Sequence, residues 1–178
     1  MRKLNCIFLF GFLLILIAGC SKMEIQPDPL YSSDESALKS AKKHEVPFKG
    51  QFVNWERKDY VAPDPDPPAT MRAYFDGEGN ATHLGKTLQF QDQQWEEGDL
   101  GAKGWGTMIF TAANGDELYS TYTSSFLWNW PVIIISGEGK FTEGTGRFEN
   151  ASGTFTLDET FDLGSGMGSG IYTGTILY

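Results

Sequence analysis

The chain has 178 residues, of which 40% are hydrophobic and 21% charged, and this composition is typical of one globular domain. Its formal net charge is −9. An acidic surface repels phosphate backbones, and no basic cluster is longer than a pair such as Lys42 and Lys43, which argues against nucleic acid as a partner. Twenty-one glycines and 14% aromatic residues favour short strands joined by tight turns, which predicts an all-β fold.

The first 19 residues have the pattern of an export signal. Arg2 and Lys3 give a positive start, residues 6–17 form an apolar run, and small residues follow. A run of this length is shorter than the roughly 20 residues of a membrane-spanning helix, which makes a permanent span the weaker alternative. We therefore predict a signal peptide at residues 1–19.

Residues 17–20 read Ile-Ala-Gly-Cys, and this tetrapeptide resembles the lipobox of bacterial lipoproteins. The resemblance implies that the chain is cut before Cys20, that the Cys20 thiol is acylated, and that the mature protein is held on the cell envelope. Ser21 is compatible with the outer membrane. Several acyl chains anchor a protein firmly, because each buried methylene contributes roughly 0.8 kcal/mol. The alternative is an ordinary secretory peptide with a chance cysteine.

Residues 20–44 predict a lipidated cysteine followed by a flexible tether, because the stretch is polar and contains Pro27, Pro29 and several serines. Cys6 leaves with the signal and Cys20 is used by the lipid, so no thiol remains for disulfides, metals or catalysis. No second histidine stands at metal-ligand spacing from His83. The sequence thus indicates neither a metal nor a cofactor.

Residues 45–178 predict one β domain, because apolar and polar residues alternate with period two in eight stretches. Side chains of usable size lie on both faces, which favours a closed barrel, and a β-sandwich remains the alternative. Residues 61–69 include four prolines and predict an exposed loop. The expected strands are 48–55, 71–75, 82–93, 105–113, 117–127, 132–142, 152–161 and 170–178.

Four segments resemble a family of uncharacterised bacterial secreted proteins: 79–86 (GNATHLGK), 113–116 (ANGD), 144–153 (GTGRFENASG) and 173–178 (TGTILY). The third segment is also similar to one in dirigent proteins and allene oxide cyclases. That likeness implies an eight-stranded antiparallel barrel. The catalytic positions of allene oxide cyclases match no residue of this chain, so no catalytic role is carried over.

Five residues are candidates for ligand binding. Trp128 and Trp130 end a dense aromatic stretch that can grip an apolar ligand at a barrel mouth or belong to the core, and Trp105 shares this chemistry. His83 shares a parity with polar residues, which suits either a polar lumen or a structural hydrogen bond to a turn. Arg147 can pair with a ligand carboxylate or fix its own glycine turn.

Three functions are compatible with these patterns. The preferred one is a non-catalytic binding or interaction module on the envelope, whose partner is a hydrophobic small molecule or an envelope protein. The second is an isomerase or cyclase of the allene oxide cyclase type that acts in the lumen, so the sequence leaves open whether the chain is an enzyme. The third is a subunit of an envelope assembly, with further copies of the chain as partners.

Replacing the lipid-accepting thiol tests the anchor. We expect the Cys20→Ala variant to move from the membrane fraction of the producing cells to the soluble fraction, because it cannot carry acyl chains. Fractionation followed by mass measurement of the N-terminal peptide checks this. Membrane retention of the variant, with an unmodified cysteine in the parent chain, would refute the prediction.

Overall fold

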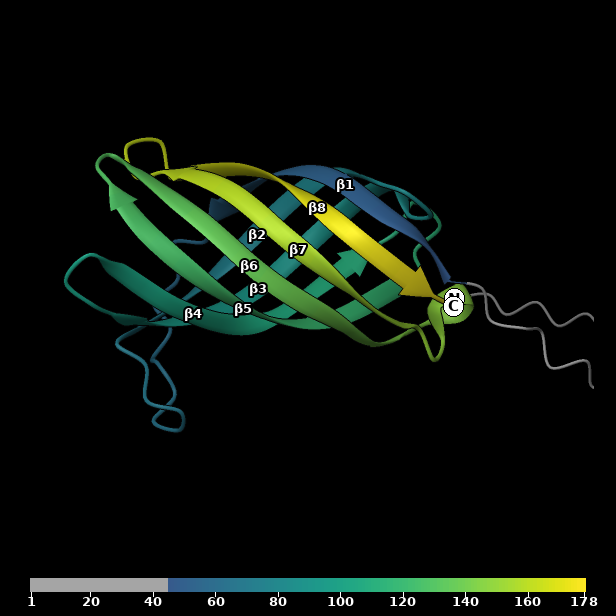
Figure 1. Cartoon of the computed structure of the whole chain (residues 1–178), viewed down its shortest axis with the longest axis horizontal. Coiled ribbons are helices and arrows are strands. Elements are labelled where there is room, and N and C mark those ends of the chain that lie inside the picture. Colours follow the sequence, from purple (N-terminus) through teal and green to yellow (C-terminus); the bar gives the residue numbers. More distant parts are fainter. Residues whose placement is uncertain (1–44) are drawn as a thin grey trace, which may run out of the picture. The chain divides into compact units, whose positions relative to one another are not determined.

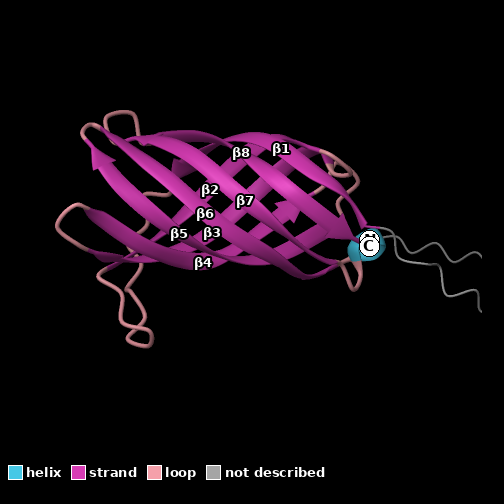
Figure 2. Ribbon diagram, viewed as in Figure 1, coloured by secondary structure: helices cyan, strands magenta, loops and turns pink. Residues whose placement is uncertain are grey.

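The structure, a computed structural model, describes residues 45–178. The predicted signal peptide, Cys20 and the tether lie outside the described residues. Residues 45–178 form a closed barrel in which neighbouring strands are antiparallel (Figure 1). Apart from one short 3₁₀ helix, the ordered elements are strands (Figure 2). Within residues 45–178, no helix has the length and apolarity that a membrane crossing requires.

Eight strands and the 3₁₀ helix make up the barrel, and each strand pairs with its neighbours in chain order. The circle closes because β1 also pairs with β8, from Glu45 opposite Leu177 to Trp55 opposite Met167. The predicted antiparallel eight-stranded barrel is therefore confirmed, and the sandwich alternative is excluded. The elements are β1 (Glu45–Glu56), β2 (Met71–Ala81), β3 (Gly85–Glu97), β4 (Gly101–Thr111), β5 (Glu117–Asn129), β6 (Val132–Gly144), η1 (Gly146–Phe148), β7 (Ser152–Asp162) and β8 (Met167–Leu177).

Two predicted strand boundaries are wrong where β2 meets β3. The strand expected at 71–75 continues to Ala81, and the one expected to begin at residue 82 begins at Gly85. Gly77 and Gly79 belong to β2 and let β1 approach closely: a Cβ atom at Gly79 would collide with the carbonyl oxygen of Gln51. The turn lies instead around His83, whose φ is 68°.

The half of the barrel that holds both ends of the described chain is filled by aromatic and aliphatic side chains, and we call this half the closed end. Phe48, which is 0% exposed, contacts Phe110, Phe141, Phe155 and Tyr172, with ring centroids 4.9 to 6.3 Å apart. These tilted and edge-to-face contacts pack the rings against one another across the lumen. Figure 1 shows η1 and the C-terminus at this end.

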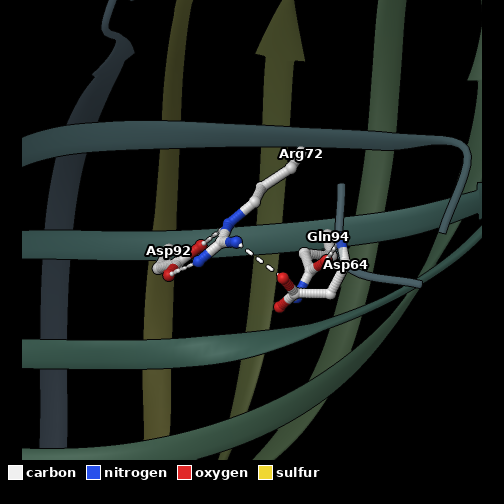
Figure 3. Close-up of polar contacts among 4 residues, drawn as sticks. All are labelled: Asp64, Arg72, Asp92 and Gln94. Carbon is white, nitrogen blue, oxygen red and sulfur yellow. Dashed lines mark hydrogen bonds and ion pairs between the residues drawn. The ribbon is translucent and has the colours of Figure 1, made fainter. Parts of the chain in front are cut away.

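The long loop between β1 and β2 is tied to the outside of the barrel (Figure 3). Arg72 of β2 donates to both carboxylate oxygens of Asp92, at 2.9 and 2.7 Å, and to Asp64 of the loop, at 3.1 Å. Gln94 of β3 accepts from the Asp64 backbone and donates to its carboxylate. The predicted exposed proline loop is present at residues 61–69. Its β-type pairing within these nine residues is limited to an isolated bridge between Pro65 and Pro68.

Truncating the centre of the closed end should unfold the barrel more readily. We expect Phe48→Ala to lower the free energy of unfolding by about 3 to 5 kcal/mol, because it removes a buried ring and leaves a cavity. Urea unfolding followed by tryptophan fluorescence measures the change. The control is Leu88→Ala, which removes an outward side chain that is 57% exposed and should change stability by less than about 1 kcal/mol. Equal losses in the two variants would contradict this account of the core.

Candidate functional site

The opposite end of the barrel opens into a cavity of about 400 Å³, which we call the mouth. Its walls are mostly aromatic and aliphatic side chains from five strands and the turns beside them, and β1 contributes Glu56. The mouth lies where the β3–β4, β5–β6 and β7–β8 turns gather, at the end of the barrel away from η1 (Figure 1). Its lining residues are Glu56, Met71, Phe75, Gln93, Trp95, Glu97, Phe126, Trp128, Trp130, Val132, Ile133, Ile135, Phe161 and Leu163.

Strand alternation explains why these side chains face inward. In β5, Ser120, Tyr122, Ser124 and Phe126 are buried at every second position, and Trp128 continues the same row at the rim. Ring contacts connect this row: Phe126 lies 6.3 Å from Trp128 and 5.9 Å from Trp95, measured between centroids. The mouth is therefore a built aromatic cavity and not a gap between loops.

A polar layer separates the mouth from the packed closed end. Its side chains face the lumen from β1, β3, β5, β7 and β8, and most are fully buried. The Tyr172 hydroxyl donates to Gln89 Oε1 at 2.8 Å, and the Ser120 hydroxyl donates to the Met108 carbonyl at 3.2 Å. The layer consists of Asn54, Gln89, Gln91, Gln93, Ser120, Tyr122, Ser124, Glu159 and Tyr172.

Glu159 is the titratable centre of this layer. Its side chain is 7% exposed, and Asn54 Nδ2 donates to its Oε1 at 2.9 Å. Burial raises the pKa of Glu159 to about 7, because desolvation disfavours the carboxylate, while the Asn54 hydrogen bond acts in the opposite direction. Desolvation and the Glu159 charge also raise the pKa of Tyr122 and of Tyr172 well above the ordinary tyrosine value. Near neutral pH, Glu159 can thus hold or release a proton.

Four buried atoms of the layer have no hydrogen-bond partner within the protein. They are Asn54 Oδ1, Gln91 Nε2, the Tyr122 hydroxyl and Ser124 Oγ. Buried polar atoms are nearly always hydrogen-bonded, since leaving one unpaired costs about 1 to 3 kcal/mol. The mixture of donors and acceptors suits a ligand group or water molecules that can do both.

A glycine makes room for the Glu159 carboxyl. A Cβ atom at Gly168 of β8 would collide with Asn54 Oδ1 and Glu159 Oε1. Two neighbours place Glu159 next to the mouth. It is the cross-strand partner of Ile135, and it precedes Phe161 by two residues on the same face of β7. Ile135 and Phe161 both line the cavity. The carboxyl therefore lies next to residues that form the floor of the mouth, and Glu159 does not itself line the cavity.

The structure brings together only two of the five residues that the sequence singled out. Trp128 and Trp130 both line the mouth, with Trp130 83% exposed at the β5–β6 turn. Trp105 has the parity of the outward residues Lys103 and Thr107 and lines a shallow groove on the outside of the barrel.

His83 and Arg147 lie in turns at the closed end, away from the mouth. His83 Nε2 is 3.1 Å from the Pro47 carbonyl, so the imidazole makes the structural contact that was one of its two interpretations. Arg147 Nε lies 3.8 Å from Asp116 Oδ2, and the guanidinium packs over the Phe148 ring. These two contacts fix the glycine turn. Both side chains contribute to the end of the barrel that is packed shut.

Sequence reasoning missed the polar layer, although two signals were present. Glu159 interrupts the apolar parity of Phe155, Leu157 and Phe161, and an acid on the apolar face of a strand is a marked exception. Three glutamines alternate at 89, 91 and 93, which indicates a polar inner face. The sequence around Asn54 carries no comparable signal. Its role depends on a hydrogen bond to Glu159 of β7, a strand that is distant in the chain.

A larger groove of about 720 Å³ lies outside the lumen, between the β1–β2 loop and the β7–β8 turn. Its lining includes the charged side chains of Glu56, Arg57, Lys58 and Asp59. Arg57 is occupied by Asp76, to which it donates at 2.6 and 2.7 Å. The mouth is smaller but is enclosed by aromatic walls above a buried titratable group, and for this reason we place the candidate site there.

Comparison with known proteins found no matching family model, no matching curated protein and no matching solved structure. Within residues 45–178, no three His, Cys, Asp or Glu side chains are grouped so that they could hold a metal ion. The assignment of a site therefore rests on the geometry of the mouth and the polar layer.

The pKa of Glu159 predicts how stability depends on pH. The group releases its proton near pH 4.5 when unfolded and near pH 7 when folded, so the folded state loses about 3 kcal/mol through Glu159 as the pH rises across this interval. Glu159→Gln removes this loss. The free energy of unfolding of the variant, relative to the parent chain, should rise by that amount between these pH values.

Urea unfolding at a series of pH values measures this difference. The control is Glu138→Gln, which removes an exposed carboxylate on the outer face of β6 and should follow the parent chain. If the Glu159→Gln curve also ran parallel to the parent curve, the shifted pKa would be disproved.

Proposed function

We propose that the chain is a cell-envelope lipoprotein whose barrel binds an apolar small molecule in the mouth without transforming it. The observation that carries the proposal is the enclosed aromatic cavity of about 400 Å³ above buried polar atoms that lack protein partners. Ligand sites are commonly apolar cavities of this order with a few polar groups at one end.

The division of the lumen supports binding at the mouth alone. The closed end is packed by rings such as Phe48 and Phe110, both 0% exposed, so a ligand has no room there. An apolar body can rest against Trp95, Phe126 and Trp128, and a polar group on it can reach the floor. Large aromatic walls supply contact area with little loss of side-chain entropy.

The envelope location rests on the sequence. The Ile-Ala-Gly-Cys tetrapeptide at 17–20 and the polar stretch that follows it support a lipid anchor with a tether. An apolar compound partitions between the membrane and the surrounding water. A barrel that is tethered to the membrane and has an open aromatic mouth is suited to capture such a compound there. The resemblance to allene oxide cyclases and dirigent proteins supports the same use of the lumen.

An isomerase or cyclase is the second candidate, and Glu159 is the observation that favours it. A carboxyl whose pKa is raised to about 7 can act as a general acid or base at neutral pH. Binding requires only the shape and polarity of the mouth, whereas proton transfer requires Glu159 itself. We prefer binding because Glu159 is hydrogen-bonded by the amide of Asn54, which cannot exchange a proton with it at neutral pH.

Two tryptophans form a matched pair for testing the mouth. We expect Trp128→Ala to weaken the binding of naphthylmethanol, a neutral aromatic alcohol, by at least about tenfold, because it removes a wall of the cavity. Trp105→Ala removes an equal side chain from the outer face and should leave the affinity unchanged. Isothermal titration calorimetry on the full-length chain measures both.

The parent chain must itself bind the alcohol for the proposal to stand. Equal weakening in the two tryptophan variants would place the binding site outside the mouth. Heat absent from all three titrations would reject the mouth as an aromatic-ligand site.

A further inference from the structure

We propose that the mouth selects apolar ligands that carry a positive charge and rejects apolar carboxylates. This inference rests on the proposed binding function and adds the chemical class of the ligand. It follows from the sign of the charges at the rim and the floor of the cavity, and from the aromatic character of its walls.

The rim of the mouth carries only negative charge. Glu56 ends the inward row of Phe52 and Asn54 on β1, and Glu97 ends the inward row of Gln93 and Trp95 on β3. Both carboxylates are exposed and both line the cavity, whose lining contains no lysine, arginine or histidine. A charged ligand entering the mouth passes two acids and meets no compensating base.

The floor of the mouth adds a third acid. Glu159 lies beneath Ile135 and Phe161, and its carboxylate accepts a hydrogen bond from Asn54. A ligand ammonium group near the floor would stabilise the Glu159 carboxylate, because an opposite charge in a desolvated site favours the ionised form. A ligand carboxylate would be repelled by the same group and would lose its hydration without gaining a partner.

The walls of the mouth favour a cation as well. Trp95, Trp128 and Trp130 line the cavity together with three phenylalanines. The faces of aromatic rings carry negative electrostatic potential, and tryptophan gives the strongest attraction for cations. Rings combined with carboxylates are the arrangement that recognises organic ammonium groups in proteins.

The nearby basic residues do not reverse this charge. Arg72 is occupied by Asp92 and Asp64, and Arg57 is occupied by Asp76, all on the outside of the barrel. Lys103 has the outward parity of β4 and lies opposite Glu96 in the register with β3. The acidic potential of the mouth is therefore left without an internal counter-charge.

Three probes of matched size separate this inference from the function on which it rests. Naphthylmethylamine is a cation at neutral pH, naphthylmethanol is neutral, and naphthoate is an anion. Each is titrated calorimetrically into the full-length chain, and titrations into the matched buffer, with any detergent used in purification, are subtracted. We expect the amine to bind at least about tenfold more tightly than naphthoate, with the alcohol between them.

Charge-neutralising variants assign the selectivity to the mouth. Glu97→Gln and Glu159→Gln should each reduce the ratio of amine to naphthoate affinity, because each removes a carboxylate at the mouth. Glu138→Gln, on the outer face of β6, is the matched control and should preserve the ratio. Loss of the ratio in the control as well would ascribe it to the net charge of the protein.

The outcomes distinguish the two levels of the proposal. If the alcohol binds but naphthoate equals or exceeds the amine, the inference on charge is overturned and the binding function stands. If none of the three probes binds, the proposed function fails, and the charge inference fails with it.

Discussion

The pairing of β1 with β8 is the constraint on which the rest of this protein depends. Eleven residue pairs, from Glu45 opposite Leu177 to Trp55 opposite Met167, close the sheet and leave it without a free edge. Closure also fixes two faces for every strand, because successive side chains alternate between lumen and exterior. Asn54 and Glu159, which are 105 residues apart in sequence, are brought into hydrogen-bonding contact by it.

The interior that closure creates is filled unevenly along its axis. At the closed end, large rings are accommodated because glycine stands opposite some of them: Gly139 of β6 pairs with Phe155 of β7, whose ring covers the glycine. Toward the mouth, the rings line the wall instead of meeting at the axis, and a cavity of about 400 Å³ remains. One end of the barrel is thus a hydrophobic core, and the other is an aromatic cavity open to solvent.

The polar layer between these halves is costly to the fold. Burial holds the pKa of Glu159 near 7, and four polar atoms around the layer have no protein partner. Apolar residues of similar size would stabilise the barrel more. Strained or unsatisfied groups that persist in a well-packed fold are commonly functional, and here they lie directly below an aromatic cavity with acids at its rim.

The amino-acid sequence by itself determined the all-β class, the approximate number of strands and the exposed proline loop, because period-two alternation and turn residues are local signals. It also singled out Trp128 and Trp130, which line the mouth in the structure, since an aromatic cluster beside a turn is a local pattern too. Only the tertiary structure decided that His83 and Arg147 belong to the closed end and that Trp105 lies on the outer face of the barrel. It alone assembled Asn54, Tyr122 and Glu159 into one layer, because that contact depends on the order and register of strands distant in the chain.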